Sequence, residues 1–358
     1  MKSMNSMKTV TVNAEDLVRE VKWMTRLKPS AAPASNIMQV RILLGALQLR
    51  RTDLDQYRES LIKGTGADQS CIEVDTELVM DVMKLHKQGR ALVGIDEDRL
   101  VIQVSGQIIR IKGVTSQEFP EWPVFERDKE RSAAVGARKL FRAMTSVSKD
   151  EVLPILGNVS FESGAMYTTD RFRMTRVIYD TDGFTALVPS VALRAFSVGD
   201  GLAIITTGNG AVAGKTDIPM VRVSSGRRSV VVRIPDGDFP NVERLIPESP
   251  TTKVTFHRDT LLAASSGQRT TIKVDGTTMT VTGSNQDGDV EIEKSITVTP
   301  IAESGPFTVS LLTQYLVDCL KAMNSGLVLF EATEPDKPLA FSDVDQATMH
   351  LVMPVRPS

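Results

Sequence analysis

The chain has 358 residues, of which 41% are hydrophobic and 24% charged, and this composition is typical of a globular protein with two to three domains. Its 42 basic and 44 acidic residues give a net charge of −2, which excludes a strongly basic nucleic-acid coat but permits a local basic face. The sequence has no apolar run long enough to span a membrane and no signal-peptide pattern, and its two cysteines, Cys71 and Cys319, are far apart. We therefore expect a cytoplasmic protein without disulfide bonds and without a membrane partner.

A short strand that leads directly into a helix is predicted three times along the chain. The strands cover residues 9–12, 132–135 and 253–256, and the helices that follow cover 14–27, 137–147 and 258–265. A second helix is predicted within each third, over 76–88, 190–197 and 310–323. Apolar or β-branched strands include 101–105, 230–234 and 279–282. The pattern predicts an α+β fold with two helices and several antiparallel strands in each third.

Short motifs recur at a spacing close to one third of the chain. Phe119-Pro120 returns as Phe239-Pro240, and Thr52-Asp53 returns 117 residues later as Thr169-Asp170. The related pair Ser284-Asn285 follows 115 residues after that. A fixed period of this length indicates repeated domains, each large enough to bury its own core. We predict three similar domains over residues 1–129, 130–249 and 250–358, with linker-like stretches at 126–131 and 247–251.

The sequence offers no positive sign of catalysis. His86, His257 and His350 have no second ligand at metal-binding spacing, and neither a nucleophile elbow nor a phosphate-binding loop is present. We therefore expect no catalytic residue, no metal and no cofactor. A hydrolase that uses Asp53 or Asp170 remains an alternative, although their equivalent places in two copies favour a structural turn. A β-rich interaction protein that does not associate with DNA is a further alternative.

Positive charge is concentrated on the predicted helices. These helices and their ends carry fifteen basic and seven acidic residues, although the whole chain is slightly acidic. Ordinary solvated helix faces would explain part of this excess. A diffuse basic surface with few aromatic side chains also suits contact with phosphates without base readout, and it disfavours a platform for stacking single-stranded bases.

Four segments together resemble one known family. They are Leu153-Pro154-Ile155-Leu156-Gly157, Thr169-Asp170 followed by Arg173, Asp238-Phe239-Pro240-Asn241 with Leu245-Ile246-Pro247, and the terminal Leu351-Val352-Met353-Pro354-Val355-Arg356. In this order and spacing they resemble the bacterial sliding clamp, the DNA polymerase III beta subunit. The start Met7-Lys8-Thr9 also resembles the start of the family, so translation could begin at Met1 or at Met7.

The resemblance implies a processivity factor and not an enzyme. It implies a head-to-tail homodimeric ring that encircles double-stranded DNA and tethers the polymerase catalytic subunit and other DNA-handling proteins. A clamp loader driven by ATP would open this ring. Helices would line the hole, where basic side chains would face the DNA: Lys22, Arg26, Arg138, Arg142, Lys149, Arg194 and Lys321.

The resemblance also implies a pocket that binds short linear peptides with apolar anchors. The pocket residues carried over from the family are Leu156, Thr169, Arg173, Met174, Pro240, Leu245, Tyr315, Leu339, Leu351, Met353, Pro354, Val355 and Arg356. Arg171 stands where the family commonly has glycine, so a bulky cation narrows this pocket or changes its preference.

The expected dimer interface is small. Ile109 and Ile111 would meet Ala263 and Ala264 across the seam, and the segment around these alanines is smaller and shorter than is usual in the family. In the first domain, Ala34-Ser35 replaces the Leu-Pro of the family, and a family arginine that contacts DNA is missing just before it. These departures leave open a phage-type clamp, or a divergent paralogue that acts as a decoy or resistance factor.

Overall fold

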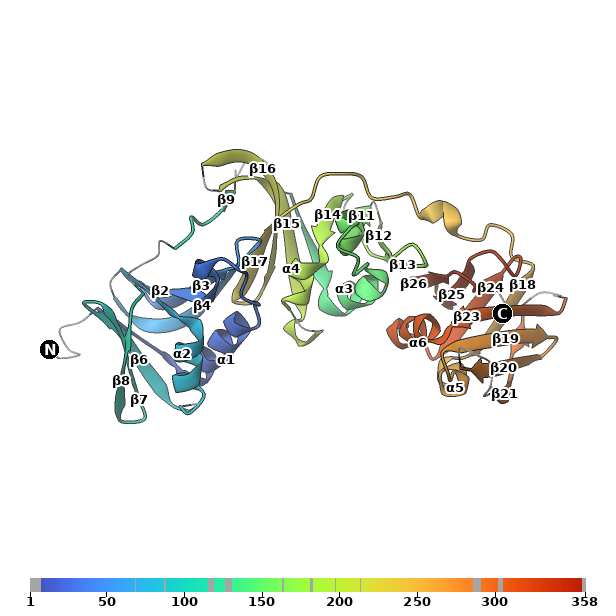
Figure 1. Ribbon diagram of the computed structural model, residues 1–358, viewed down its shortest axis with the longest axis horizontal. Helices are drawn as coiled ribbons and strands as arrows, with labels where there is room; N and C mark the ends of the chain where they lie inside the picture. The colour runs from blue at the N-terminus through green and yellow to red at the C-terminus, as the bar shows by residue number, and fades with distance from the viewer. Residues whose placement is uncertain are drawn as a thin grey trace. The chain divides into compact units, whose positions relative to one another are not determined.

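The computed structural model describes residues 8–355 except 68, 87, 115–118, 126–130, 163, 181–182, 197, 213, 286–290 and 302–304. The chain divides into two compact units, the first formed by residues 1–134 and 191–234 and the second by 135–190 and 235–358 (Figure 1). Within the described residues, no helix is long and apolar enough to cross a membrane.

The first unit is built on one large sheet. Its strands run in the order β10-β15-β16-β17-β4-β1-β6-β7-β8, and β2, β3, β5 and β9 join from the side. The strands are β1 (Thr9–Asn13), β2 (Ile37–Leu43), β3 (Ala46–Thr52), β4 (Gln56–Ala67), β5 (Ser70–Asp75), β6 (Arg90–Asp96), β7 (Arg99–Val104), β8 (Gln107–Lys112), β9 (Val124–Phe125), β10 (Arg131–Gly136), β15 (Leu202–Val212), β16 (Lys215–Ser225) and β17 (Arg228–Arg233). The α-helices are α1 (Ala14–Thr25), α2 (Thr76–Met83) and α4 (Ser190–Arg194).

The second unit contains two sheets, ordered β14-β11-β12-β13-β26-β25-β24-β18-β22 and β21-β20-β19-β23. The strands of the first are β11 (Asn158–Glu162), β12 (Ala165–Thr169), β13 (Arg173–Ile178), β14 (Ala186–Pro189), β18 (Thr252–His257), β22 (Thr299–Pro300), β24 (Leu327–Ala332), β25 (Leu339–Asp343) and β26 (Thr348–Val352). Those of the second are β19 (Arg269–Asp275), β20 (Thr278–Ser284), β21 (Glu291–Thr297) and β23 (Phe307–Leu312). The α-helices are α3 (Ala137–Ala143), α5 (Arg258–Ala264) and α6 (Thr313–Ala322).

The predicted fold class is confirmed, because the structure is α+β with antiparallel strand pairing. Strands β1, β10 and β18 each lead directly into a helix, as predicted, and β5, β14 and β23 lead into the second helix of each third. Asp75 caps α2 by accepting hydrogen bonds from the backbone N–H groups of Glu77 and Leu78. Helix α6 begins at Thr313 and not at Ser310, because Ser310 still pairs with Thr271 in the sheet.

Two strand pairings explain why the compact units differ from the three predicted segments. Strand β17 of the middle segment pairs with β4 of the first segment, where Val231 lies opposite Tyr57. Strand β13 of the middle segment pairs with β26 of the third segment, where Met174 lies opposite Leu351. The middle segment therefore contributes to both units, and each unit has a sheet that continues from one predicted segment into the next.

Candidate functional site

The tight turn between β12 and β13 organises the site. Asp170 Oδ1 accepts hydrogen bonds from the backbone N–H groups of Phe172 (3.1 Å) and Arg173 (2.9 Å). Thr169 Oγ1 accepts a hydrogen bond from the Arg171 N–H at 3.1 Å and donates one to the Arg173 carbonyl at 2.8 Å. Arg171 has φ of 79°, a left-handed conformation that glycine adopts readily and L residues adopt rarely.

The same turn occurs in the first predicted domain. Asp53 Oδ1 accepts hydrogen bonds from the N–H groups of Asp55 (3.1 Å) and Gln56 (2.7 Å), and Thr52 Oγ1 accepts one from the Leu54 N–H (2.9 Å). Leu54 also has φ of 79°. Asp53 and Asp170 therefore have the same structural role, which supports the repeat and disfavours a hydrolytic role for either carboxylate.

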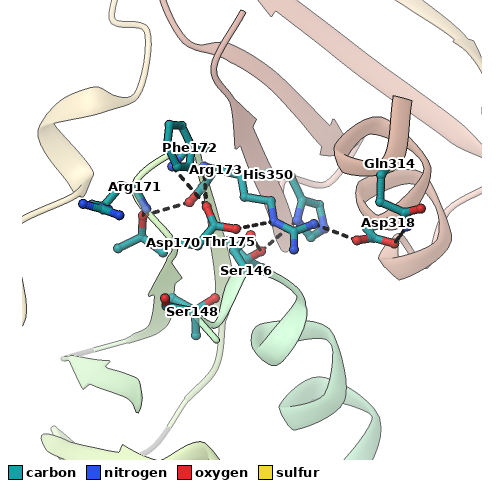
Figure 2. A network of polar contacts seen from close by, with 12 residues as sticks. Ser146, Ser148, Asp170, Arg171, Phe172, Arg173, Thr175, Gln314, Asp318 and His350 are labelled. Carbon is teal, nitrogen blue, oxygen red and sulfur yellow. Dashed lines mark hydrogen bonds and ion pairs between the residues drawn. The ribbon is translucent and has the colours of Figure 1, made fainter. Parts of the chain in front are cut away.

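Arg173 connects this turn to helix α6, as Figure 2 shows. Its Nε donates to Asp170 Oδ2 at 2.8 Å, its Nη1 donates to Asp318 Oδ2 at 2.7 Å, and its guanidinium carbon lies 4.5 Å from the ring centroid of Tyr315. Burial lowers the pKa of Arg173, but the hydrogen bonds to Asp318 and Asp170 outweigh it and leave the pKa above its usual value. Arg173 is therefore a fixed positive charge held between two carboxylates.

A buried chain of polar side chains lies beneath Arg173. Ser146 Oγ lies 2.7 Å from Thr175 Oγ1, which lies 2.9 Å from His350 Nδ1. Complete burial and, to a smaller extent, the positive charge of Arg173 together lower the pKa of His350 to about 3. His350 is therefore neutral near pH 7 and serves to support the sheet beneath the turn.

Apolar side chains cover the other face of the same strands. Met174 and Leu351 belong to a buried cluster with Ala165, Tyr167, Val242, Ala340 and Met349. Phe239 and Ile246, from the segment that follows β17, pack against this cluster. The segment at 238–247 thus lies next to the strands that carry Met174 and Leu351.

The structure brings most of the predicted pocket residues to one end of β13 and β26. The Met353 N–H donates to the Phe172 carbonyl at 2.8 Å, and the Val355 N–H donates to the Ser310 carbonyl at 2.8 Å. These bonds hold the C-terminal segment against the Thr169–Arg173 turn and against β23. Arg356 lies outside the described residues.

The predicted pocket residues differ in accessibility. Pro240, Leu245 and Met353 are exposed, and Arg173, Tyr315, Pro354 and Val355 are half-buried. Leu156, Thr169, Met174, Leu339 and Leu351 are buried. Leu339 belongs to a buried cluster that includes Val352 and side chains of α6, and Tyr315 packs against this cluster. The accessible part therefore consists of the turn, the C-terminal segment and the segment at 238–247.

Sequence reasoning missed three residues of this arrangement. Phe172 is 53% exposed beside the Met353 backbone. On α6, Gln314 Nε2 donates a hydrogen bond to Asp318 Oδ1 at 2.6 Å. Asp318 lies one helical turn after Tyr315, a spacing that places both on one face of the helix and could have identified it. Nothing in the sequence pairs Asp318 with Arg173, which is 145 positions away.

Six of the predicted DNA-facing residues lie on or directly after α-helices of the two units, and Lys149 lies in the loop between α3 and β11. Lys22, Arg26, Arg138, Lys149, Arg194 and Lys321 are exposed, and Arg142 is half-buried with Nη2 donating to Asn324 Oδ1 at 2.6 Å. Within the described ranges, no ion pair involves any of these seven residues. They therefore retain their charge for a partner.

The predicted dimer residues lie near two sheet edges. Ile109 is half-buried and Ile111 buried on β8, which is the last strand of its sheet. Ala263 is exposed at the end of α5, whereas Ala264 is buried in the core of its own unit. Strand β21 forms the edge of the smaller sheet, and Lys294 on it donates to the Ala263 carbonyl at 2.8 Å.

Comparison with known proteins finds similarity to bacterial sliding clamps. The beta sliding clamp of Streptococcus pneumoniae (strain TIGR4) is 27% identical over 292 residues, covering 73% of this chain and 74% of the relative. The beta sliding clamp of Synechocystis is 24% identical over 354 residues, covering 87% and 88%. The chain is a divergent relative of the bacterial sliding clamps. No protein-family model matches it.

Solved structures support the same fold. The sliding clamp of Bartonella birtlesii, DNA polymerase III subunit beta, superposes with a TM-score of 0.83 at 18% identity, covering 98% of this chain and all of that structure. The DNA polymerase III subunit beta of Pseudomonas aeruginosa gives a TM-score of 0.81 at 17% identity with the same coverage. The chain therefore has the sliding-clamp fold along nearly its whole length.

Proposed function

We propose that this protein is a sliding clamp, a processivity factor that encircles duplex DNA and tethers a polymerase and other DNA-handling proteins. The observation that carries the proposal is the clamp fold over 98% of the chain, together with curated clamp relatives over most of its length. The protein would act without catalysis, in the cytoplasm, as a topological tether. The three domains would cover residues 1–129, 130–249 and 250–358.

The charge distribution suits a tether that slides. A sliding protein needs attraction to phosphates that does not depend on sequence, and dispersed lysine and arginine side chains provide it. The seven basic residues predicted to face the DNA have this property, because six are exposed and none is neutralised by a described acid.

Neutralising these charges tests the DNA contact. In the double variant Lys22→Gln, Arg138→Gln, we expect weaker association with duplex DNA and a salt slope reduced by about one per residue that contacts phosphate. The matched control is Lys215→Gln, Lys273→Gln, because these two lysines are exposed on strands β16 and β19. Equal loss in both double variants would contradict the assignment of the helices to the DNA.

We propose a head-to-tail homodimer that joins edge strands β8 and β21 of different copies. An unpaired edge strand is a ready site for pairing with another chain. Strand β8 carries Arg110 and Lys112, whereas β21 carries Glu291 and Glu293 beside Lys294, so their charges are complementary. Ile109 and the exposed Ala263 lie next to these edges.

Light scattering across protein concentrations tests the dimer. The ring requires twice the chain mass of 39.1 kDa, persisting on dilution. A specific observation favours a second candidate function, a clamp paralogue that acts as a decoy or resistance factor: of the two alanines predicted at the seam, the small Ala263 is exposed and Ala264 is buried. A persistent monomer would support that candidate.

Partner proteins would insert a short linear segment at the turn that carries Arg173. Exposed or half-buried apolar side chains lie at this turn, notably Tyr315 and Met353, and methionine adapts to several related peptides. The polymerase catalytic subunit, a clamp loader and other motif-bearing proteins would share the site.

The function is tested by measuring the length of DNA made in one binding event by a bacterial polymerase III with its clamp loader. Adding this protein should lengthen the products when excess competitor DNA prevents rebinding. Products of unchanged length, from a preparation that is dimeric and folded, would contradict the proposal.

A further inference from the structure

Arg171 is an accessible cation at the tip of the turn that organises the candidate peptide site. Its side chain is 57% exposed, and its backbone has a φ of 79°. The equivalent residue in the first domain, Leu54, has the same φ and no charge. The turn itself therefore does not require an arginine here, and the exposed guanidinium is available for a role in binding.

The surroundings of Arg171 combine charge with apolar surface. Its guanidinium carbon lies 5.9 Å from the ring centroid of Phe172, which is itself exposed. The Phe172 carbonyl accepts the hydrogen bond from the N–H of Met353, whose side chain is 36% exposed. One cation and two accessible apolar side chains thus lie on two backbone segments that this hydrogen bond joins, and Figure 2 shows Arg171 and Phe172 on the first of them.

The two arginines of the turn differ in availability. Arg173 is committed to Asp170 and Asp318 by hydrogen bonds of 2.8 Å and 2.7 Å. Arg171 makes one ion pair, with Nη2 3.4 Å from Asp150 Oδ2, between two well-exposed side chains. A pair of this kind contributes little to stability and is screened by salt, so an incoming carboxylate can replace Asp150.

We propose that Arg171 determines specificity at this site by selecting linear partner segments that carry a carboxylate beside their apolar anchors. This inference rests on the proposed function, because it assumes that partner segments bind at this turn. The carboxylate would meet the Arg171 guanidinium, while the apolar anchors contact Phe172, Met353 and the neighbouring apolar side chains.

The test uses two sets of synthetic nine-residue peptides with a central Leu-Phe pair as anchors. One set places a single Asp at each flanking position in turn, and the other places Asn at the same positions. Binding to the full chain is measured by fluorescence anisotropy at low and high salt. The variants are Arg171→Leu, which copies the residue found in the first domain, Arg171→Lys, which retains the charge, and Leu54→Gly as the matched control at the equivalent turn.

We expect the wild type to bind at least one Asp peptide about two- to fivefold more tightly than its Asn partner at low salt, with less preference at high salt. Arg171→Leu should bind both peptides with equal affinity, whereas Arg171→Lys and Leu54→Gly should keep the preference. Equal binding of Asp and Asn peptides by a wild type that binds both would overturn the role of Arg171 and leave the peptide site intact. Failure of every peptide to bind the folded wild type would overturn the peptide site, and the inference with it.

Discussion

Leu54 and Arg171 lie 117 residues apart and have the same backbone conformation, each with φ of 79°. The hydrogen bonds around them also match, because Asp53 and Asp170 each accept two backbone N–H groups from the residues that follow. The repeat of the Thr-Asp pair in the sequence is thus a repeat of one turn. The two copies have diverged in side chain, to leucine in one and to arginine in the other.

Replacing Leu54 by glycine should stabilise the protein. A left-handed conformation costs an L residue about 1–2 kcal/mol, and glycine adopts it freely but loses about 0.5–1 kcal/mol more conformational entropy on folding. We expect Leu54→Gly to raise the free energy of unfolding by up to about 1.5 kcal/mol, measured by urea denaturation. Arg171→Gly should gain less, because it also loses the contacts with Asp150 and Phe172. A urea midpoint for Leu54→Gly lower than that of the wild type would show that the backbone at Leu54 is not strained.

The bridge from Arg173 to helix α6 should contribute measurably to stability. The Arg173 side chain is only 13% exposed, and its removal leaves Asp170 and Asp318 without the positive charge that they share. We expect Arg173→Gln to cost about 1–3 kcal/mol in urea denaturation. Asp170→Ala should cost more than Asp318→Ala, because Asp170 also accepts two backbone N–H groups, which alanine cannot do. The reverse order would show that the turn does not depend on the Asp170 carboxylate.

Glu20 should be the most sensitive acidic residue of α1. Its side chain is 1% exposed, accepts a hydrogen bond from Ser60 at 2.8 Å, and accepts two from Arg228, at 2.7 Å and 3.2 Å. Replacing it with glutamine keeps the shape and removes the charge that neutralises Arg228. We expect Glu20→Gln to cost about 2–4 kcal/mol. The matched control, Glu15→Gln on the exposed part of the same helix, should change stability by less than about 0.5 kcal/mol. Similar losses in the two variants would refute this role.

His350 should make stability fall as the pH is lowered. Burial lowers its pKa to about 3 in the folded chain, whereas the unfolded chain takes up the proton near pH 6.5. The unfolded state therefore binds more protons between these values, and stability falls by up to about 1.4 kcal/mol per pH unit below 6.5. His350→Asn should remove this slope between pH 6.5 and 5, where aspartate and glutamate do not yet dominate. Stability that falls equally with pH in the wild type and in His350→Asn would contradict this role of His350.

Local features of the fold were predictable from the sequence. The order of strand and helix, the cap at Asp75 and the turn at Asp170 follow from short-range patterns that act within a few residues. The sequence predicts that the last helix begins at residue 310, three residues before α6 begins in the structure. Ser310 and Leu312 are extended instead, because they pair with β19. Pairing with β19 thus overrides local propensity there.

Long-range features could not be predicted from the residues alone. The ion pair of Arg173 with Asp318 and the hydrogen bond from Trp23 Nε1 to the Ala195 carbonyl each join segments more than 140 positions apart. Such contacts depend on which strands pair, and strand pairing is not encoded in any single stretch of sequence. Burial was likewise misjudged for Ala264, which lies in the core although its neighbour Ala263 is exposed.

The central claim is topological and can be tested on circular DNA. The protein is loaded onto circular duplex DNA by a bacterial clamp loader with ATP, the contacts between copies are sealed with a bifunctional cross-linker, and the complex is washed in high salt. We predict that sealed protein stays on the circle and is released when a restriction enzyme cuts the DNA once. Loss of sealed protein from the intact circle in high salt, or equal retention on cut and intact DNA, would contradict the account.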